Sequence, residues 1–197
     1  MHRHLVLTLV LMLTLLGGNG AQASPITYTA VLSGLAEAPP NASPGTGFAT
    51  VVFDLLAHTM EVDFWFSGLS GTTTASHIHA ATAAPGAGTA GVATQLPRFV
   101  GFPTGVTAGS YSHVFDMTAL ASFNPSYVTA HGGTAGTAEA ALALAAFDGK
   151  AYLNIHTSFL PAGEIRGFLA PVPDPGSSLL LLGMGLVGLG AWKKRLG

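Results

Sequence analysis

Cysteine is absent from the 197-residue chain, and charged side chains make up only 8% of it. The first absence excludes disulfide bonds and thiolate metal ligands. The second lies far below the level of about a quarter that is usual for soluble domains, whereas glycine is abundant at 26 residues. This composition is typical of short strands joined by tight turns, and it argues against long charged helices.

Basic residues are particularly scarce in the middle of the chain. Between Ser24 and Pro171 there are three, namely Arg98, Lys150 and Arg166, against eight acidic residues. A nucleic-acid site needs clustered lysine and arginine side chains to neutralise phosphates. The composition therefore excludes nucleic acid as a partner.

The N-terminal segment has the layout of a secretory signal peptide. A short start with Arg3 precedes an apolar run over residues 5–16, and Ala21 and Ala23 form a small-x-small cleavage site. The alternative is an uncleaved membrane anchor or a buried helix, but a run of twelve residues is too short to span a bilayer comfortably, and the Ala-x-Ala site has no structural reason to be there. The sequence therefore predicts a signal peptide over residues 1–23, which signal peptidase removes.

The C-terminal segment, residues 172–197, joins a stiff proline-rich stretch to an apolar run and a basic end. The apolar run covers residues 179–192, and the 16 residues from Ser177 to Trp192 would form a helix of roughly 24 Å. This pattern predicts a short transmembrane helix whose basic end stays in the cytoplasm. The basic end consists of Lys193, Lys194 and Arg195.

This arrangement resembles the PEP-CTERM sorting signal of Gram-negative bacteria. Pro173, Asp174 and Pro175 stand at the position of the Pro-Glu-Pro motif, with aspartate in place of glutamate. The resemblance implies cleavage by an exosortase-type enzyme after export across the inner membrane. The protein would first be anchored in the membrane by its helix and then reach the cell surface or the extracellular space. A plain membrane anchor behind a proline-rich linker is the alternative.

Period-two alternation predicts strands between the two ends. In residues 60–66 every second side chain is large and apolar, Phe64 among them, and residues 47–55 repeat the pattern with Phe53. The four residues 56–59 are a hairpin-length connection, so we expect Phe53 and Phe64 to face inward on paired strands. Strands are expected at residues 26–32, 47–55, 60–66, 77–79, 111–116, 151–157 and 165–170.

Helix signals are few. Asn124 and Pro125 predict a short helix that ends before Gly132, and residues 137–147 predict a second one that opens on a threonine cap. Many antiparallel strands with one or two short helices predict a mainly β fold, an antiparallel β-sandwich, over residues 24–171. The glycine- and proline-rich segments 81–91 and 99–109 are expected to form surface loops.

Three motifs of this domain resemble those of one family. They are Leu-Ser-Gly followed by Glu and Pro-Pro in residues 32–40, His-Ile-His at 77–79, and Tyr-Leu-Asn-Ile-His with Gly-Glu-Ile-Arg-Gly in residues 151–167. In this order they are similar to the CHRD domain, named for repeats in the signalling antagonist chordin. The resemblance spans residues 26–169 and implies a β-rich extracellular module without an established reaction.

Three histidines form a candidate metal site. Alternate residues of a strand share a face, so the side chains of His77 and His79 project together about 6.6 Å apart. His156 lies on another strand, and if the strands are close the three imidazoles could hold zinc or copper with one position left open. Asn154 or Glu164 could then orient a ring. The alternative is that the histidines occupy hydrogen-bonded polar niches that hold the strands together.

Other polar residues have simpler interpretations. Glu61 and Asp63 are explained by a solvated strand edge, and Glu164 with Arg166 predicts a surface ion pair of little energetic value. The histidines outside the candidate metal site, His58, His113 and His131, are interpreted as ordinary surface residues.

The function predicted from these patterns is that of a surface-associated module without enzymatic activity. It would have a binding, adhesive or structural role, with extracellular polysaccharide or matrix as its partner. No Gly-x-Ser-x-Gly elbow, phosphate-binding loop or His-Glu-x-x-His motif supports a common enzyme class. The alternative is a small histidine-ligated metalloprotein or metalloenzyme with redox chemistry. By analogy at the level of fold, superoxide dismutase places such a copper site on a β-sandwich.

Overall fold

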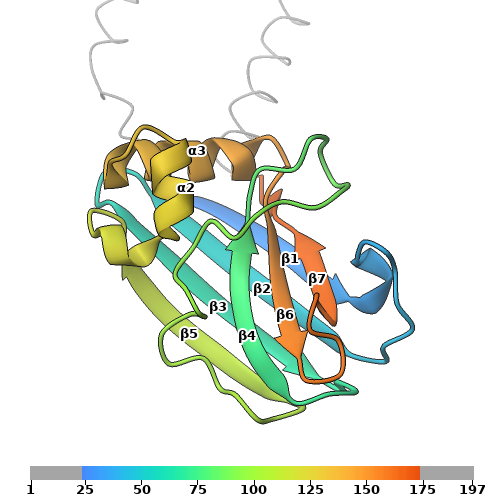
Figure 1. Ribbon diagram of the computed structural model, residues 1–197. Helices are drawn as coiled ribbons and strands as arrows, with labels where there is room; N and C mark the ends of the chain where they lie inside the picture. Colours follow the sequence, from blue (N-terminus) through green and yellow to red (C-terminus); the bar gives the residue numbers. More distant parts are fainter. Residues whose placement is uncertain (1–23, 174–197) are drawn as a thin grey trace, which may run out of the picture.

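The computed structural model describes residues 24–173 (Figure 1). They form eight strands, two α-helices and two short 3-10 helices. The strands are β1 (Ile26–Ser33), β2 (Thr46–Asp54), β3 (Thr59–Ser67), β4 (Thr73–His79), β5 (Gly109–Asp116), β6 (Tyr152–Thr157), β7 (Ile165–Phe168) and β8 (Ala170–Pro171). The helices are η1 (Gly34–Ala36), η2 (Leu120–Ser122), α2 (Pro125–Ala130) and α3 (Ala135–Phe147).

The strands belong to one antiparallel sheet in the order β4-β6-β7-β1-β2-β3-β5, with β8 paired to β1. In Figure 1 the strands β4, β6 and β7 lie in front of β2, β3 and β5, and α2 and α3 lie together at one end. Side chains from both halves of the sheet belong to a single buried core. The prediction of a mainly β fold is confirmed, and the two layers are halves of one curled sheet.

The alternation in β2 and β3 has the predicted orientation. Phe53 and Phe64 are buried, with 1% and 4% of their surface exposed, and the two strands are paired over their full length. The Phe64 ring packs against Phe102 and Tyr111, with ring centroids 5.9 Å and 5.2 Å away. Phe64 therefore connects the sheet with the long β4–β5 connection.

We expect Phe64→Ala to lower the free energy of unfolding by about 3–5 kcal/mol, because it removes a buried ring and leaves a cavity among aromatic neighbours. Urea denaturation of wild type and variant measures the difference. Trp65→Ala is the matched control, since that side chain is 50% exposed on the other face of β3. A Phe64→Ala midpoint equal to that of wild type would contradict the burial of this ring.

The helices begin at polar caps. The Asn124 side chain accepts a hydrogen bond from the Ser126 N–H at the start of α2, as the sequence predicts. In α3 the cap is Thr134, and Thr137 completes a capping box three residues later. The second helix was expected to begin near residue 137, so its start is earlier than predicted because Thr137 sits inside the first turn.

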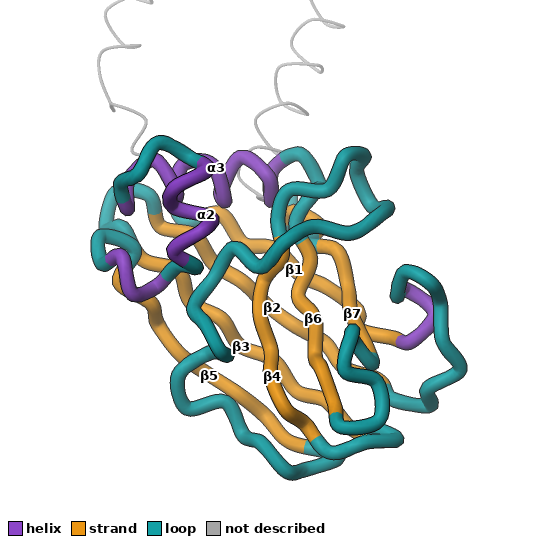
Figure 2. The backbone as a smooth tube through the Cα atoms, in the orientation of Figure 1, coloured by secondary structure: helices purple, strands orange, loops and turns teal. Residues whose placement is uncertain are grey.

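The connection between β4 and β5, residues 80–108, lies against the outer edge of β4 (Figure 2). Its backbone donates hydrogen bonds from Phe99 to the Ser76 carbonyl and from Ala93 to the Ile78 carbonyl. The sequence predicts only surface loops here. By satisfying the carbonyls of an edge strand, this segment protects β4 from further pairing and comes to lie beside its histidines.

The predicted signal peptide, its cleavage site, the transmembrane helix and the basic end lie outside the described residues, as do Asp174 and Pro175 of the sorting motif. No helix in residues 24–173 is long and apolar enough to cross a membrane.

Candidate metal centre

Three histidines from two paired strands meet on one face of the sheet. His77 and His79 lie on β4, where they flank the fully buried Ile78, and His156 lies on the neighbouring β6. In the register of the two strands Ala75 pairs with His156, and His77 pairs with Asn154. His156 is therefore diagonal to His77 on the same face, a spacing that long side chains bridge.

The three imidazole rings form a nearly equilateral triangle. The ring centroids of His77 and His79 are 5.8 Å apart, those of His77 and His156 5.4 Å, and those of His79 and His156 5.6 Å. One nitrogen from each ring lies within 4.8 Å of the other two. The structure thus brings together all three histidines that the sequence groups as a site.

Each ring is oriented by a backbone carbonyl from a loop. His77 Nε2 lies 2.8 Å from the Pro97 carbonyl oxygen, and His79 Nδ1 lies 2.9 Å from that of Ala90. For His156 the contact is from Nδ1 to the Pro161 carbonyl, at 3.0 Å. A carbonyl oxygen only accepts hydrogen bonds, so these ring nitrogens carry the protons.

The second nitrogen of each ring is buried and has no hydrogen-bond partner. These atoms are His77 Nδ1, His79 Nε2 and His156 Nε2. Since the first nitrogen of each ring is the donor, the second holds a lone pair in the neutral imidazole. Three such lone pairs in one cluster are an arrangement that could hold a metal ion.

Burial also keeps these rings neutral. It disfavours the charged imidazolium and lowers the pKa of His77 and of His79 to about 4. Burial lowers the pKa of His156 as well. At neutral pH the three rings therefore present lone pairs without first losing a proton, which is the state that binds a metal ion.

We expect the metal-free protein to lose stability as the pH falls from about 6.5 to about 4. In this window the unfolded chain protonates His77 and His79 while the folded chain, with pKa values of about 4, does not. Each ring lowers the free energy of unfolding by at most roughly 3 kcal/mol over this pH window. Urea denaturation at pH 7 and pH 4.5, with a chelator present, measures it.

The control for this prediction is the double variant His77→Gln with His79→Gln, whose stability should change less over the same interval. Glu37 acts in the opposite direction, because burial raises its pKa to about 7. Its stabilising contribution is complete below about 4.5 and is lost as the pH rises through 7. An equal pH dependence in wild type and double variant would show that the two rings are not buried in their neutral form.

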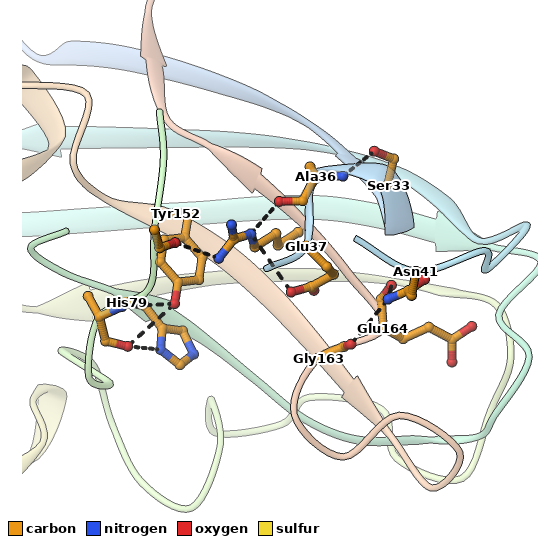
Figure 3. A network of polar contacts seen from close by, with 11 residues as sticks. Ser33, Ala36, Glu37, Asn41, His79, Tyr152, Gly163 and Glu164 are labelled. Atoms are coloured by element: carbon orange, nitrogen blue, oxygen red, sulfur yellow. Dashed lines mark hydrogen bonds and ion pairs between the residues drawn. The ribbon is translucent and has the colours of Figure 1, made fainter. Parts of the chain in front are cut away.

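The His79 ring stacks on the Tyr152 ring (Figure 3), and Tyr152 in turn packs against the Arg166 guanidinium. The Tyr152 ring lies parallel to the His79 ring with centroids 4.9 Å apart, and the Arg166 guanidinium lies 4.6 Å from the Tyr152 centroid. The Tyr152 hydroxyl also accepts a hydrogen bond from the N–H of Ala90, whose carbonyl holds His79. The sequence carries no signal for this role of Tyr152, because the role depends on a stack across strands.

Arg166 is buried, with 3% of its surface exposed. It donates hydrogen bonds to the carbonyls of Ala36 and Gly88, and its Nε lies 3.8 Å from a Glu37 carboxylate oxygen. The expected surface ion pair with Glu164 is therefore wrong. Arg166 and Glu164 belong to separate buried networks, since they share no partner.

Asn154 lies between the histidines and Arg166 in the register of the sheet, paired with His77 on one side and with Arg166 on the other. Its amide packs against Gly163, where a Cβ atom would lie 2.5 Å from Asn154 Nδ2 and 2.7 Å from Glu37 Oε1. Only glycine can occupy position 163, because any side chain there would overlap with Asn154 and Glu37. The Asn154 Oδ1 and Glu37 Oε1 atoms are buried without partners. Buried polar side chains therefore continue from the histidine cluster on β4 across β6 to Arg166 on β7.

Glu164 is fully buried, and its carboxylate contacts three loop residues and Thr157 at the end of β6 rather than a histidine ring. It accepts from the hydroxyls of Ser43 and Thr157, both at 2.6 Å, and from the backbone N–H groups of Ser70 and Gly71 at 2.5 Å and 3.1 Å. Burial alone would raise the pKa of Glu164, but these donors outweigh it and hold the pKa below its ordinary value.

The histidines outside the cluster are not all ordinary surface residues. His58 Nδ1 lies 2.6 Å from a carboxylate oxygen of Glu139, which is buried on α3, so it ties the β2–β3 turn to the helix. His113 packs edge-on against Phe115 at 4.6 Å, and the His131 ring lies 4.0 Å from that of Tyr127. Only the His58 contact depends on a partner far away in the sequence, since His113 and Phe115 are two residues apart on β5 and His131 follows Tyr127 by four residues at the end of α2.

Comparisons with protein families give two matches. A family model described as CHRD domain matches residues 28–169, and one described as VPDSG-CTERM motif matches residues 171–196. The chain reads Val-Pro-Asp-Pro-Gly from Val172, so Asp174 agrees with the motif and Pro175 stands in place of its serine. Comparisons with curated proteins and with solved structures give no match. The two resemblances noted in the sequence are confirmed.

Proposed function

The chain belongs to the CHRD domain family, and on that premise we propose that its domain holds one transition-metal ion on His77, His79 and His156. The sorting motif supports an exported surface protein and implies processing by an exosortase-type enzyme. The protein is thus a metal-binding module displayed at the cell surface. Its leader peptide and its membrane anchor remain predictions from the sequence.

The three unpartnered ring nitrogens carry this proposal. If the histidines only filled polar niches, each ring would need partners for both of its nitrogens, because burying an unsatisfied polar atom costs about 1–3 kcal/mol. Each ring has one partner, a loop carbonyl, and its other nitrogen is buried without one. A metal ion satisfies all three atoms at once.

The donor set favours zinc and copper over other metals. Calcium and magnesium prefer oxygen ligands, whereas three neutral imidazoles suit Zn²⁺ and Cu²⁺. At a bond length of about 2.0–2.1 Å, two ligating nitrogens lie roughly 3.3 Å apart in a tetrahedral site. The nitrogens of this cluster lie within 4.8 Å of one another, so a bound ion would draw the rings closer. Three protein ligands leave a position open for water or another small ligand.

The test is a metal titration of the full chain purified in mild detergent. After dialysis against a chelator, the protein is titrated with Zn²⁺ and with Cu²⁺ and followed by calorimetry and elemental analysis. One ion per chain is expected, with copper bound more tightly than zinc, and nitrogen couplings are expected in the electron paramagnetic resonance spectrum of the Cu²⁺ form. Protein that retains neither ion above background would overturn the proposal.

A further inference from the structure

Two exposed aromatic side chains lie side by side on the outer face of the sheet, away from the core. Phe48 on β2 and Trp65 on β3 are direct cross-strand partners, and they are 37% and 50% exposed. Neighbouring strands are about 4.8 Å apart, so the two rings form one apolar strip. The metal centre uses neither residue, and exposed aromatic clusters of this kind mark binding surfaces.

A second row beside this strip is polar. Thr50, Asp63 and Ser112 pair with one another across β2, β3 and β5, and Ser110 extends the aromatic row beyond Trp65. The two rows are two residues apart along the strands, or about 6.7 Å. Together these side chains line a surface groove of about 370 Å³, which is within the range of small-ligand sites.

We propose that this groove binds a neutral polysaccharide. A sugar ring has an apolar face of C–H groups and a rim of hydroxyls. Its face would stack on Trp65 and Phe48, as flat apolar groups do on exposed aromatic rings. Its hydroxyls would then lie over the polar row, where the Asp63 carboxylate accepts hydrogen bonds and the Ser112 and Thr50 hydroxyls can donate or accept them.

The charge of the surface restricts the class of polymer. None of the three basic residues between Ser24 and Pro173 lines the groove, whereas Asp63 lies in it and Glu61 follows on the same face of β3. Carboxylated or sulfated polymers would meet like charge without a compensating cation. Arginine, which is common in the centres of protein interfaces, is also missing from this face. A neutral glycan therefore fits better than an anionic one or a protein.

Tryptophan fluorescence provides the experiment, since the chain contains only two tryptophans, Trp65 and Trp192. In a Trp192→Phe background the full chain, in mild detergent, is titrated with cellohexaose, laminarihexaose and mannohexaose as neutral probes and with hexagalacturonate as the anionic probe. A saturable change in Trp65 emission is expected with at least one neutral hexamer. No such change is expected with hexagalacturonate. Calorimetry then compares Trp65→Ala with the parent, and at least a tenfold loss of affinity is expected.

Three further variants separate recognition from folding and from metal binding. Trp65→Phe should retain most of the affinity because it keeps a flat ring, and Phe48→Ala should weaken binding on its own. Phe147→Ala is the matched control, because this ring is 68% exposed on α3, outside the groove, and should change nothing. His77→Ala should bind the hexamer like the parent. The proposal is overturned if no neutral hexamer binds at millimolar concentration, if the anionic hexamer binds better, or if Trp65→Ala and Phe48→Ala leave the affinity unchanged.

Discussion

His77→Ala is expected to lower the affinity of the protein for copper and zinc by at least about 100-fold, and His156→Ala should do the same. Removing even an outer partner of a metal ligand costs 10–100-fold in affinity, and each of these variants removes one of the three proposed ligands. Calorimetric titration of the metal-free variants measures the loss. A second measure is the stabilisation by metal, which should reach about 2.7 kcal/mol in wild type when the free ion is at 100 times its dissociation constant and should fall to about 0.4 kcal/mol or less in the variants at the same ion concentration.

His58→Ala is the matched control for this prediction. It also removes an imidazole, but one that lies in the β2–β3 turn and contacts Glu139 on α3. Its metal affinity should equal that of wild type even if its stability falls. Equal binding by His77→Ala, His156→Ala and His58→Ala would mean that the ion binds elsewhere, and the histidine cluster would then be a structural feature.

Glu164→Ala is expected to destabilise the protein by at least about 4 kcal/mol, which is a large part of the 5–15 kcal/mol that a domain of this kind has. The substitution leaves two hydroxyls and two backbone N–H groups without their acceptor in a buried site, and each such group costs about 1–3 kcal/mol. The backbone donors, Ser70 and Gly71, precede β4, Thr157 ends β6, and Ser43 lies in the loop before β2. The loss should therefore loosen three segments at once.

The isosteric variant Glu164→Gln separates charge from shape. Its amide keeps one acceptor oxygen but turns an NH₂ group toward donors, so it should cost about 2–4 kcal/mol. Glu61→Ala, which removes an exposed carboxylate on β3, should stay within about 0.5 kcal/mol of wild type. Urea denaturation compares the three variants. If Glu164→Ala unfolded like Glu61→Ala, the four hydrogen bonds would contribute nothing to stability.

The sequence predicted the histidine cluster because the information is local. In β4 the buried Ile78 separates His77 from His79, so strand periodicity alone places both rings on the opposite face. The same rule holds in β6, where Ile155 is buried and His156 faces the other way. The proximity of the two strands could not be derived from periodicity, because it depends on the pairing of distant segments.

The residues around the cluster were predicted less well for the same reason. Pro97 and Ala90 act through backbone carbonyls of the β4–β5 connection, and a carbonyl has no signature in sequence. Glu37 and Arg166 stand in the family motifs, but the sequence alone does not predict that both side chains are buried. Nor does it predict that Arg166 Nε lies 3.8 Å from Glu37 Oε2. Their positions follow from the close approach of η1 to β7, which is long-range structure.

Exported domains often join their loops with disulfide bonds, and this one joins them with a single carboxylate. Glu164 holds segments far apart in the sequence, and the chain has no cysteine that could do so. Reducing agents should therefore leave the folded domain unchanged, and its maturation needs no thiol oxidant. Acid is the condition that matters: since the pKa of Glu164 is depressed, its contribution persists above about 4.5 and is lost only as the pH falls through the lower value of the folded state.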